Sequence, residues 1–121
     1  MTYSIKEASE RTGLSQHTIR YYCDLDLIPT LQRDENNNRL FDEASINWLY
    51  AIKFLRLSQM SLKEIKAFFE EQDCNPSNID DRVALLKKAI EVSDDKLQQT
   101  IKEHDQLKAR LENYLTHTDC K

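Results

Sequence analysis

The feature that most constrains the fold is the C-terminal third of the chain, where no glycine or proline occurs in residues 79–121. These two residue types disrupt helix interiors, so a long stretch without either favours one continuous helix. Spacings of three and four residues alternate along it, which is a heptad pattern over about five repeats. The seam positions are Val83, Leu86, Ile90, Ser93, Leu97, Thr100, His104, Leu107, Leu111 and Tyr114. A helix with so narrow an apolar stripe needs a partner to bury it.

We expect the partner to be the same helix of a second copy, because two-fold homodimers are the commonest oligomers. The dimerisation residues are then Val83, Leu86, Ile90, Leu97, Ile101, His104, Leu107, Leu111 and Tyr114. Polar residues on the seam would fix its register at a cost in stability. Two alternatives stay open: the helix could fold back on the N-terminal part of its own chain, or pair with another protein as a helical adaptor.

Two short capped helices are predicted near the N-terminus. Ser4 and Glu7 have the spacing of a capping box that opens a helix over residues 6–12. Gly13 can take the left-handed conformation that ends this helix, and Ser15 can cap the next one. Two helices joined by a short turn containing glycine predict a helix-turn-helix.

The second of these helices, residues 15–23, carries mainly hydrogen-bonding side chains, and Ile19 is its only plainly aliphatic one. Such side chains can contact base edges in a DNA major groove, while flanking phosphates accept from arginine and tyrosine. An ordinary amphipathic surface helix is the alternative. The candidate DNA-binding residues of this helix are Gln16, His17, Thr18, Arg20, Tyr21 and Tyr22.

A β-hairpin is expected next, from residues 31–33 and 39–41, with Asn36 and Asn37 supplying a tight turn without glycine. The hairpin could serve as a wing that contacts phosphates, or it could be a solvated loop without a partner. Its candidate DNA-binding residues are Arg33, Asn37, Asn38 and Arg39.

Two more helices complete the N-terminal part. Asp42 caps a helix that runs to about Leu57. Its apolar residues are spread around much of its circumference, so we expect it to be the central helix of the core. Ser61 opens another, in which Leu62, Ile65, Phe68 and Phe69 form the expected buried stripe. We therefore expect a mainly helical, all-α fold with a small β-hairpin. It comprises a winged helix-turn-helix domain at 1–72, a linker at 73–78, and a dimerisation helix with a short tail at 79–121.

Composition limits the function. The net charge is −4, so any DNA site must depend on where Arg and Lys are placed. No apolar run is long enough to cross a bilayer and no secretion signal is visible, which favours the cytoplasm and no membrane partner. The three histidines are far apart and no Gly-rich phosphate loop occurs, so we expect no enzyme activity.

In order and spacing these elements resemble the MerR family of bacterial transcription regulators, over essentially the whole chain. The matching residues are 3–8 (Tyr-Ser-Ile-Lys-Glu-Ala), 12–15 (Thr-Gly-Leu-Ser), 18–22 (Thr-Ile-Arg-Tyr-Tyr), 27–29, 33–41, 52–56 and 60–65. The resemblance implies homodimers whose long helices pack antiparallel and which bind pseudo-palindromic operators between promoter elements. Such regulators untwist an overlong spacer, so they act on RNA polymerase through the promoter DNA.

Carried onto this chain, the resemblance implies that Thr18, Arg20 and Tyr21 lie on the helix that reads the groove. It also implies a second wing at Ser61 and Lys63, where a helix N-terminus can receive a phosphate. The chain departs from the family pattern at three positions. These are Asn37 in place of the wing glycine, Asn38 where an aromatic is common, and Cys23 where an acidic residue is usual.

The sequence contains few signals for the effector to which such a regulator would respond. Three cysteines far apart favour reduced thiols, and inert cysteines are the commonest outcome. Metal sensing is disfavoured because His117, Asp119 and Cys120 beyond the long helix make a poor ligand set, so we expect no metal and no cofactor. A small-molecule or thiol-reactive effector would bind between the long helix and the DNA-binding domain. The candidate residues for it are Trp48, Tyr50, Cys74 and Cys120.

Overall fold

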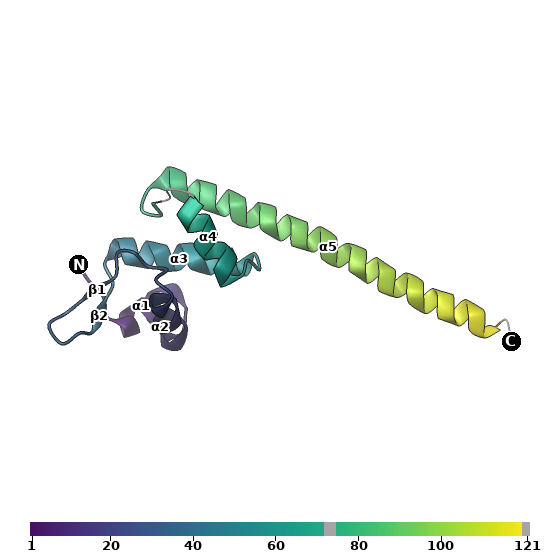
Figure 1. The fold of residues 1–121 in the computed structure, drawn as a ribbon, viewed down its shortest axis with the longest axis horizontal. Coiled ribbons are helices and arrows are strands. Elements are labelled where there is room, and N and C mark those ends of the chain that lie inside the picture. The colour runs from purple at the N-terminus through teal and green to yellow at the C-terminus, as the bar shows by residue number, and fades with distance from the viewer. Residues whose placement is uncertain (72–74, 120–121) are drawn as a thin grey trace.

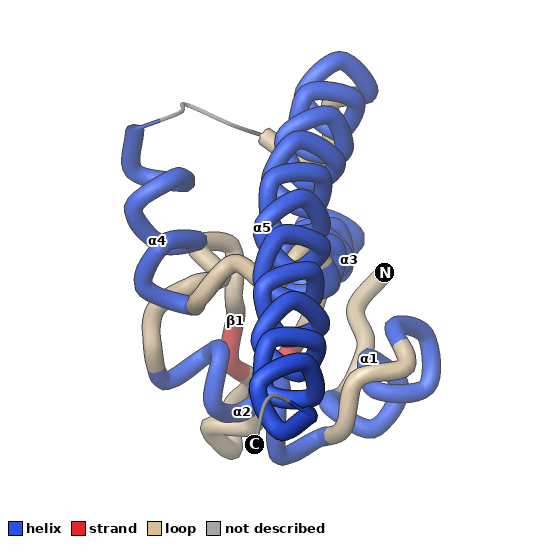
Figure 2. Tube along the Cα trace, turned by 90° about the vertical axis from the view of Figure 1, so that its right-hand side faces the viewer, coloured by secondary structure: helices blue, strands red, loops and turns tan. Residues whose placement is uncertain are grey.

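The computed structural model describes residues 1–71 and 75–119. Its elements are α1 (Ile5–Thr12), α2 (Gln16–Asp24), β1 (Gln32–Arg33), β2 (Arg39–Leu40), α3 (Glu43–Leu57), α4 (Leu62–Glu71) and α5 (Ile79–Asp119). The first four helices and the antiparallel hairpin form a head, and α5 crosses the head and extends far beyond it (Figure 1). Figure 2 shows α4 on one side of α5 and α1 on the other. The mainly helical fold with a small hairpin is as the sequence predicted.

Side-chain caps start the helices where the sequence placed them. Ser4 Oγ accepts from the Glu7 backbone N–H at 3.1 Å, and a Glu7 carboxylate oxygen accepts from the Ser4 N–H at 3.0 Å. Ser15 Oγ likewise accepts from the Thr18 N–H at 3.0 Å, and Asp42 caps α3. These caps satisfy N–H groups that have no partner within the helix, which is why they fix where each helix begins.

The core is built around α3, as predicted. Leu49, Ile52 and Leu55 are wholly buried, and α3 contacts α1, α4 and α5. In α4 the expected buried stripe is only partly correct, since Ile65 is wholly buried while the other three residues are partly exposed. Only one side of α4 lies against α3, so its outer residues stay in contact with solvent.

Gly13 ends α1 with φ 78°, a left-handed conformation that costs any residue with a Cβ. An added Cβ would also lie 3.2 Å from Lys53 Nζ, which donates to the Thr12 carbonyl at 2.6 Å. We therefore expect Gly13→Ala to lower the free energy of unfolding by about 1 kcal/mol. Urea unfolding followed by circular dichroism measures this, with Lys6→Ala on the exposed surface of α1 as the control. Equal midpoints for both variants would contradict it.

Two different faces of α5 have different surroundings. Leu85 and Ala89 are buried and Val92 is partly buried, because this face packs on α3. The heptad pattern did not predict this second face. The first half of α5 thus folds back on its own head, which was one of the alternatives, and yet the seam stays uncovered. Its exposed side chains are Val83 (43%), Leu86 (44%), Ile90 (61%), Leu97 (56%), Ile101 (46%), Leu107 (71%), Leu111 (59%) and Tyr114 (60%).

Candidate nucleic-acid interface

The solvent-facing side of α2 is polar. His17, Arg20 and Tyr21 are exposed, and Gln16 and Thr18 are half-buried. Among the described residues, the Arg20 side chain makes one long hydrogen bond, to the Gln16 side-chain oxygen at 3.4 Å within one helical turn. This side of α2 therefore presents donors and acceptors that are available to a groove.

Tyr22 does not belong to that exposed side. It is 6% exposed and lies in the core with Ile19 and Cys23. Burial raises the pKa of the Tyr22 hydroxyl, while the nearby Arg56 guanidinium lowers it. The sequence prediction that Tyr22 contacts DNA directly is thus corrected. Tyrosine has an apolar ring as well as a polar tip, so its position on the helix could not by itself decide which of the two is used.

The hairpin turn is organised by Asp34, which the sequence analysis did not single out. Its Oδ1 accepts from the backbone N–H groups of Asn36 at 2.9 Å and Asn38 at 2.8 Å, and Oδ2 accepts from the Asn38 side chain at 3.2 Å. Asn37 adopts φ 64°, so it supplies the positive φ expected of this turn, and Arg33 donates to its carbonyl at 2.9 Å. An aspartate two residues before a turn is the signal that could have revealed this cap.

Hydrogen bonds from Asn38 and Asn36 hold the pKa of the Asp34 carboxyl below its usual 3.8. Because the pKa is lowered in the folded state, the ionised carboxylate stabilises the turn at pH values above the ordinary pKa. This stabilisation is lost as the pH falls through the pKa of the folded state. In an NMR titration we expect the Asn36 and Asn38 amide shifts to change together with a midpoint below 3.8. Asp34→Ala should remove that transition and Glu35→Gln should keep it. A midpoint at or above the ordinary value would refute the cap.

Both candidate wings are joined to the C-terminal end of α2. From the hairpin, Arg39 Nη2 pairs with Asp24 Oδ1 at 3.1 Å, and from α4, Lys66 Nζ donates to the Leu25 carbonyl at 3.3 Å. Arg39 Nε is buried without a hydrogen-bond partner among the described residues. Because the Arg39 side chain is only 21% exposed, it braces the hairpin against α2 more than it faces solvent. Arg33 is the exposed arginine of this hairpin.

The start of α4 carries a second capping box. Ser61 Oγ accepts from the Glu64 N–H at 3.1 Å, and a Glu64 carboxylate oxygen accepts from the Ser61 N–H at 3.0 Å. Hydrogen bonds from the Ser61 backbone and side chain lower the pKa of the Glu64 carboxyl, which keeps a negative charge at this helix end. Lys63 is exposed beside it. A phosphate here would therefore depend on Lys63 to offset the Glu64 charge.

The two effector candidates that the structure describes, Trp48 and Tyr50, have different surroundings. Trp48 is 8% exposed and packs edge-on against Phe69, with ring centroids 4.9 Å apart. Tyr50, two residues along, instead lines a cavity with Pro76 of the linker. Cys74 and Cys120 lie outside the described residues.

The remaining effector signals are weak within the described part of the chain. Among residues 1–71 and 75–116, whose side chains the structure describes, no group of three or more metal-ligating side chains occurs. Burial raises the pKa of the Cys23 thiol, which disfavours the reactive thiolate.

No helix in the described ranges is apolar enough over a sufficient length to span a bilayer.

Comparison with known proteins gives these elements a family. Residues 3–72 match the profile of the MerR HTH family of regulatory proteins. An uncharacterized HTH-type transcriptional regulator of Haemophilus influenzae is 37% identical over 72% of this chain and 64% of its own length. CueR of Bacillus subtilis, also an HTH-type transcriptional regulator, is 31% identical over 75% of this chain and 62% of its own. The chain thus spans about half to two thirds of the curated relatives that it matches.

Solved structures agree in fold. HiNmlR, described as a MerR family regulator lacking the sensor domain and bound to promoter DNA, has a TM-score of 0.63 and 31% identity, covering 87% of this chain and 80% of its own. A MerR family regulator of Listeria monocytogenes has a TM-score of 0.59 and 32% identity, covering 95% and 87%. The relatives are regulators and not enzymes, in agreement with the expectation from the sequence. The chain belongs to the MerR family of helix-turn-helix regulatory proteins.

Proposed function

We propose that this protein is a sequence-specific transcriptional regulator that binds a pseudo-palindromic promoter operator as a homodimer. The observation that carries the proposal is the exposed polar side of α2, anchored by buried Ile19 and joined at its end to both wings. It works in the cytoplasm, changes transcription by distorting the promoter spacer, and affects RNA polymerase through that DNA. The promoter-bound relative supports the DNA-binding part.

The negative net charge limits how much general electrostatic attraction contributes to DNA binding. With a charge of −4, general attraction to DNA is weak, so affinity must come from placed cations such as Arg20, Arg33 and Lys63. Phosphate contacts make affinity fall with salt, whereas base contacts distinguish sequences. We therefore expect sequence-selective retention with a modest salt dependence.

The test is a gel shift with promoter DNA from beside the protein's own gene and a scrambled duplex, at two salt concentrations. Selective retention of the promoter at both supports the proposal. Absence of any retention would instead favour a helical adaptor that uses α5 to pair with another protein, which is the second candidate. The exposed seam of α5 is the observation that keeps the adaptor in consideration.

The dimer that we propose is antiparallel about a midpoint between Gln98 and Gln99 of α5. Seam residues equally far from this midpoint then face each other. The pairs are Val83 with Tyr114, Leu86 with Leu111, Ile90 with Leu107, Ser93 with His104, and Leu97 with Thr100. Large apolar residues meet apolar ones at both ends, and the hydroxyl of Ser93 meets an imidazole that can bond to it. The seam residues occupy the two apolar positions of the heptad, called a and d. In this alignment every residue at position a faces a residue at position d, as an antiparallel pair of heptads requires.

A further observation supports this orientation. On the head, Phe54 (40% exposed) and Leu57 (69% exposed) of α3 line one groove with Leu86 and Ile90. The second half of α5 extends beyond its own head (Figure 1), and Leu107 and Leu111 on this half are exposed. An antiparallel copy lays this half along the groove of the partner, so both apolar surfaces are buried at once.

Cysteine crosslinking tests the register. With Cys23→Ala, Cys74→Ser and Cys120→Ser as background, Ser93→Cys together with His104→Cys should give a disulfide-linked dimer on mild oxidation. Ser93→Cys alone should not, because its two copies lie 11 residues apart along the helix pair, or about 16 Å at 1.5 Å per residue. Non-reducing electrophoresis reads the result. Efficient linkage by the single cysteine would show a parallel pair instead.

A further inference from the structure

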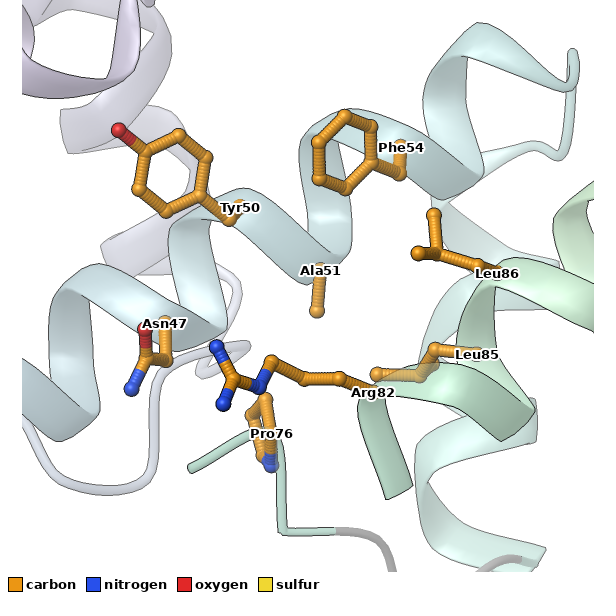
Figure 3. A pocket seen from close by; sticks show the side chains of 8 residues that line it. All are labelled: Asn47, Tyr50, Ala51, Phe54, Pro76, Arg82, Leu85 and Leu86. Carbon is orange, nitrogen blue, oxygen red and sulfur yellow. The ribbon is translucent and has the colours of Figure 1, made fainter. Parts of the chain in front are cut away.

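A cavity of about 240 Å³ lies between α3 and the first turns of α5. Figure 3 shows its walls: Tyr50, Ala51 and Phe54 come from α3, Arg82 and Leu86 from α5, and the Ala51 methyl group points into the space. An apolar cavity of about 150 Å³ is enough for a benzene ring. This cavity can therefore hold one ring with a small substituent.

The linker closes one side of the cavity. Pro76 is wholly buried against it, and Ser77 Oγ accepts from the Asn47 side-chain amide at 3.2 Å. One wall therefore belongs to the DNA-binding head, one to the dimerisation helix and one to the segment between them. A molecule bound here contacts all three, so it can favour one arrangement of α5 relative to the head.

Among the described residues that line the cavity, Arg82 is the only charged one. It extends from α5 toward Asn47 on α3 (Figure 3), and no hydrogen bond or ion pair of its side chain is found among the described residues. The neighbouring Asp81 carboxylate is already engaged by the Asn75 N–H at 2.8 Å. Tyr50 is also engaged, since its hydroxyl donates to the Arg11 carbonyl at 2.6 Å and leaves its ring toward the cavity.

An apolar space with one guanidinium at its edge matches one class of ligand. We propose that this cavity binds a small aromatic carboxylate, with the carboxylate on Arg82 and the ring among Tyr50, Ala51 and Leu85. Arginine binds carboxylates through two parallel N–H···O bonds, and an aromatic ring packs well against the ring of Tyr50. That the ligand acts as an effector rests on the proposed function, while the binding itself does not.

Calorimetric titration of the full chain with benzoate, in the absence of DNA, tests the site. We expect saturable binding, with affinity at least about tenfold lower for benzamide, which has the same shape and no charge. Arg82→Met should lower benzoate affinity by at least about tenfold, and Ala51→Leu, which fills the cavity, should do the same. Lys87→Met removes one exposed charge of α5 outside the cavity and should leave the affinity unchanged.

If benzoate shows no saturable binding at concentrations up to about 10 mM, the proposal is overturned, because the dissociation constant would then be too high for a specific site. Equal affinities for Arg82→Met and Lys87→Met would also overturn it. Arg82 is exposed, so its replacement keeps the test valid even if Ala51→Leu fails to fold. A protein that binds benzoate but never retards promoter DNA would sink the proposed function and leave this site intact.

Discussion

Ile90→Asp is expected to give a monomer that no longer binds a full operator. Ile90 is 61% exposed in the single chain, so its replacement leaves the head folded. In the proposed dimer Ile90 faces Leu107 of the partner in two symmetric layers, and losing two buried side chains costs about 3 to 6 kcal/mol. Burying two unpaired carboxylates adds to this cost. Dimer affinity should therefore fall by about 10²- to 10⁴-fold.

Analytical ultracentrifugation at micromolar concentration measures the change, together with the operator gel shift. The matched control is Ala109→Asp, which places the same charge on an exposed position of α5 off the seam. The control should remain a dimer. A dimeric Ile90→Asp protein, or a wild-type protein that sediments as a monomer, would contradict the proposed dimer. Loss of dimer should also weaken operator binding, because spacing between two recognition helices sets which sites are bound.

Arg20→Ala should strongly weaken selective operator binding without unfolding the protein. Arg20 is exposed on α2 and has only the long contact to Gln16, so little folding energy depends on it. A good arginine contact to a base contributes about 1 to 3 kcal/mol, and the dimer makes it in both half-sites. We expect a loss of about 2 to 6 kcal/mol, or roughly 30- to 10⁴-fold.

The gel shift at two salt concentrations separates the two roles that Arg20 can have. Loss of discrimination between promoter and scrambled DNA marks a base contact, and a uniform loss with a smaller salt slope marks a phosphate contact. Lys102→Ala removes an equal charge from the exposed surface of α5 and should change neither quantity. Unchanged retention by Arg20→Ala would mean that α2 is not the recognition helix.

Local sequence signals were sufficient for the order of elements in the head. A cap depends on a few neighbouring residues, so Ser4, Ser15 and Asp42 could be assigned from spacing alone. The positive φ at Asn37 followed in the same way from the turn chemistry. The spacing of the turn residues did not predict the role of Asp34, because Asp34 lies before the turn and acts through hydrogen bonds to the backbone of Asn36 and Asn38.

Burial, by contrast, depends on which elements meet. The sequence could not tell that Tyr22 faces the core while Tyr21, its neighbour, is 52% exposed. Trp48 and Tyr50 were grouped as one effector site, yet they point to different surroundings on α3. Residues two apart on a helix lie about 200° apart around its axis, so only the packing of α4 and α5 on α3 separates them.

The sequence by itself determined that this chain is a capped helix-turn-helix with a hairpin, followed by one long helix that exposes an apolar seam. Those properties follow from local propensity and periodicity, which act within a few residues. Only the tertiary structure decided that a second face of α5, through Leu85 and Ala89, packs on α3 and leaves a cavity beside Arg82. Contacts between segments distant in sequence depend on how surfaces fit together, and periodicity within one helix does not encode that fit.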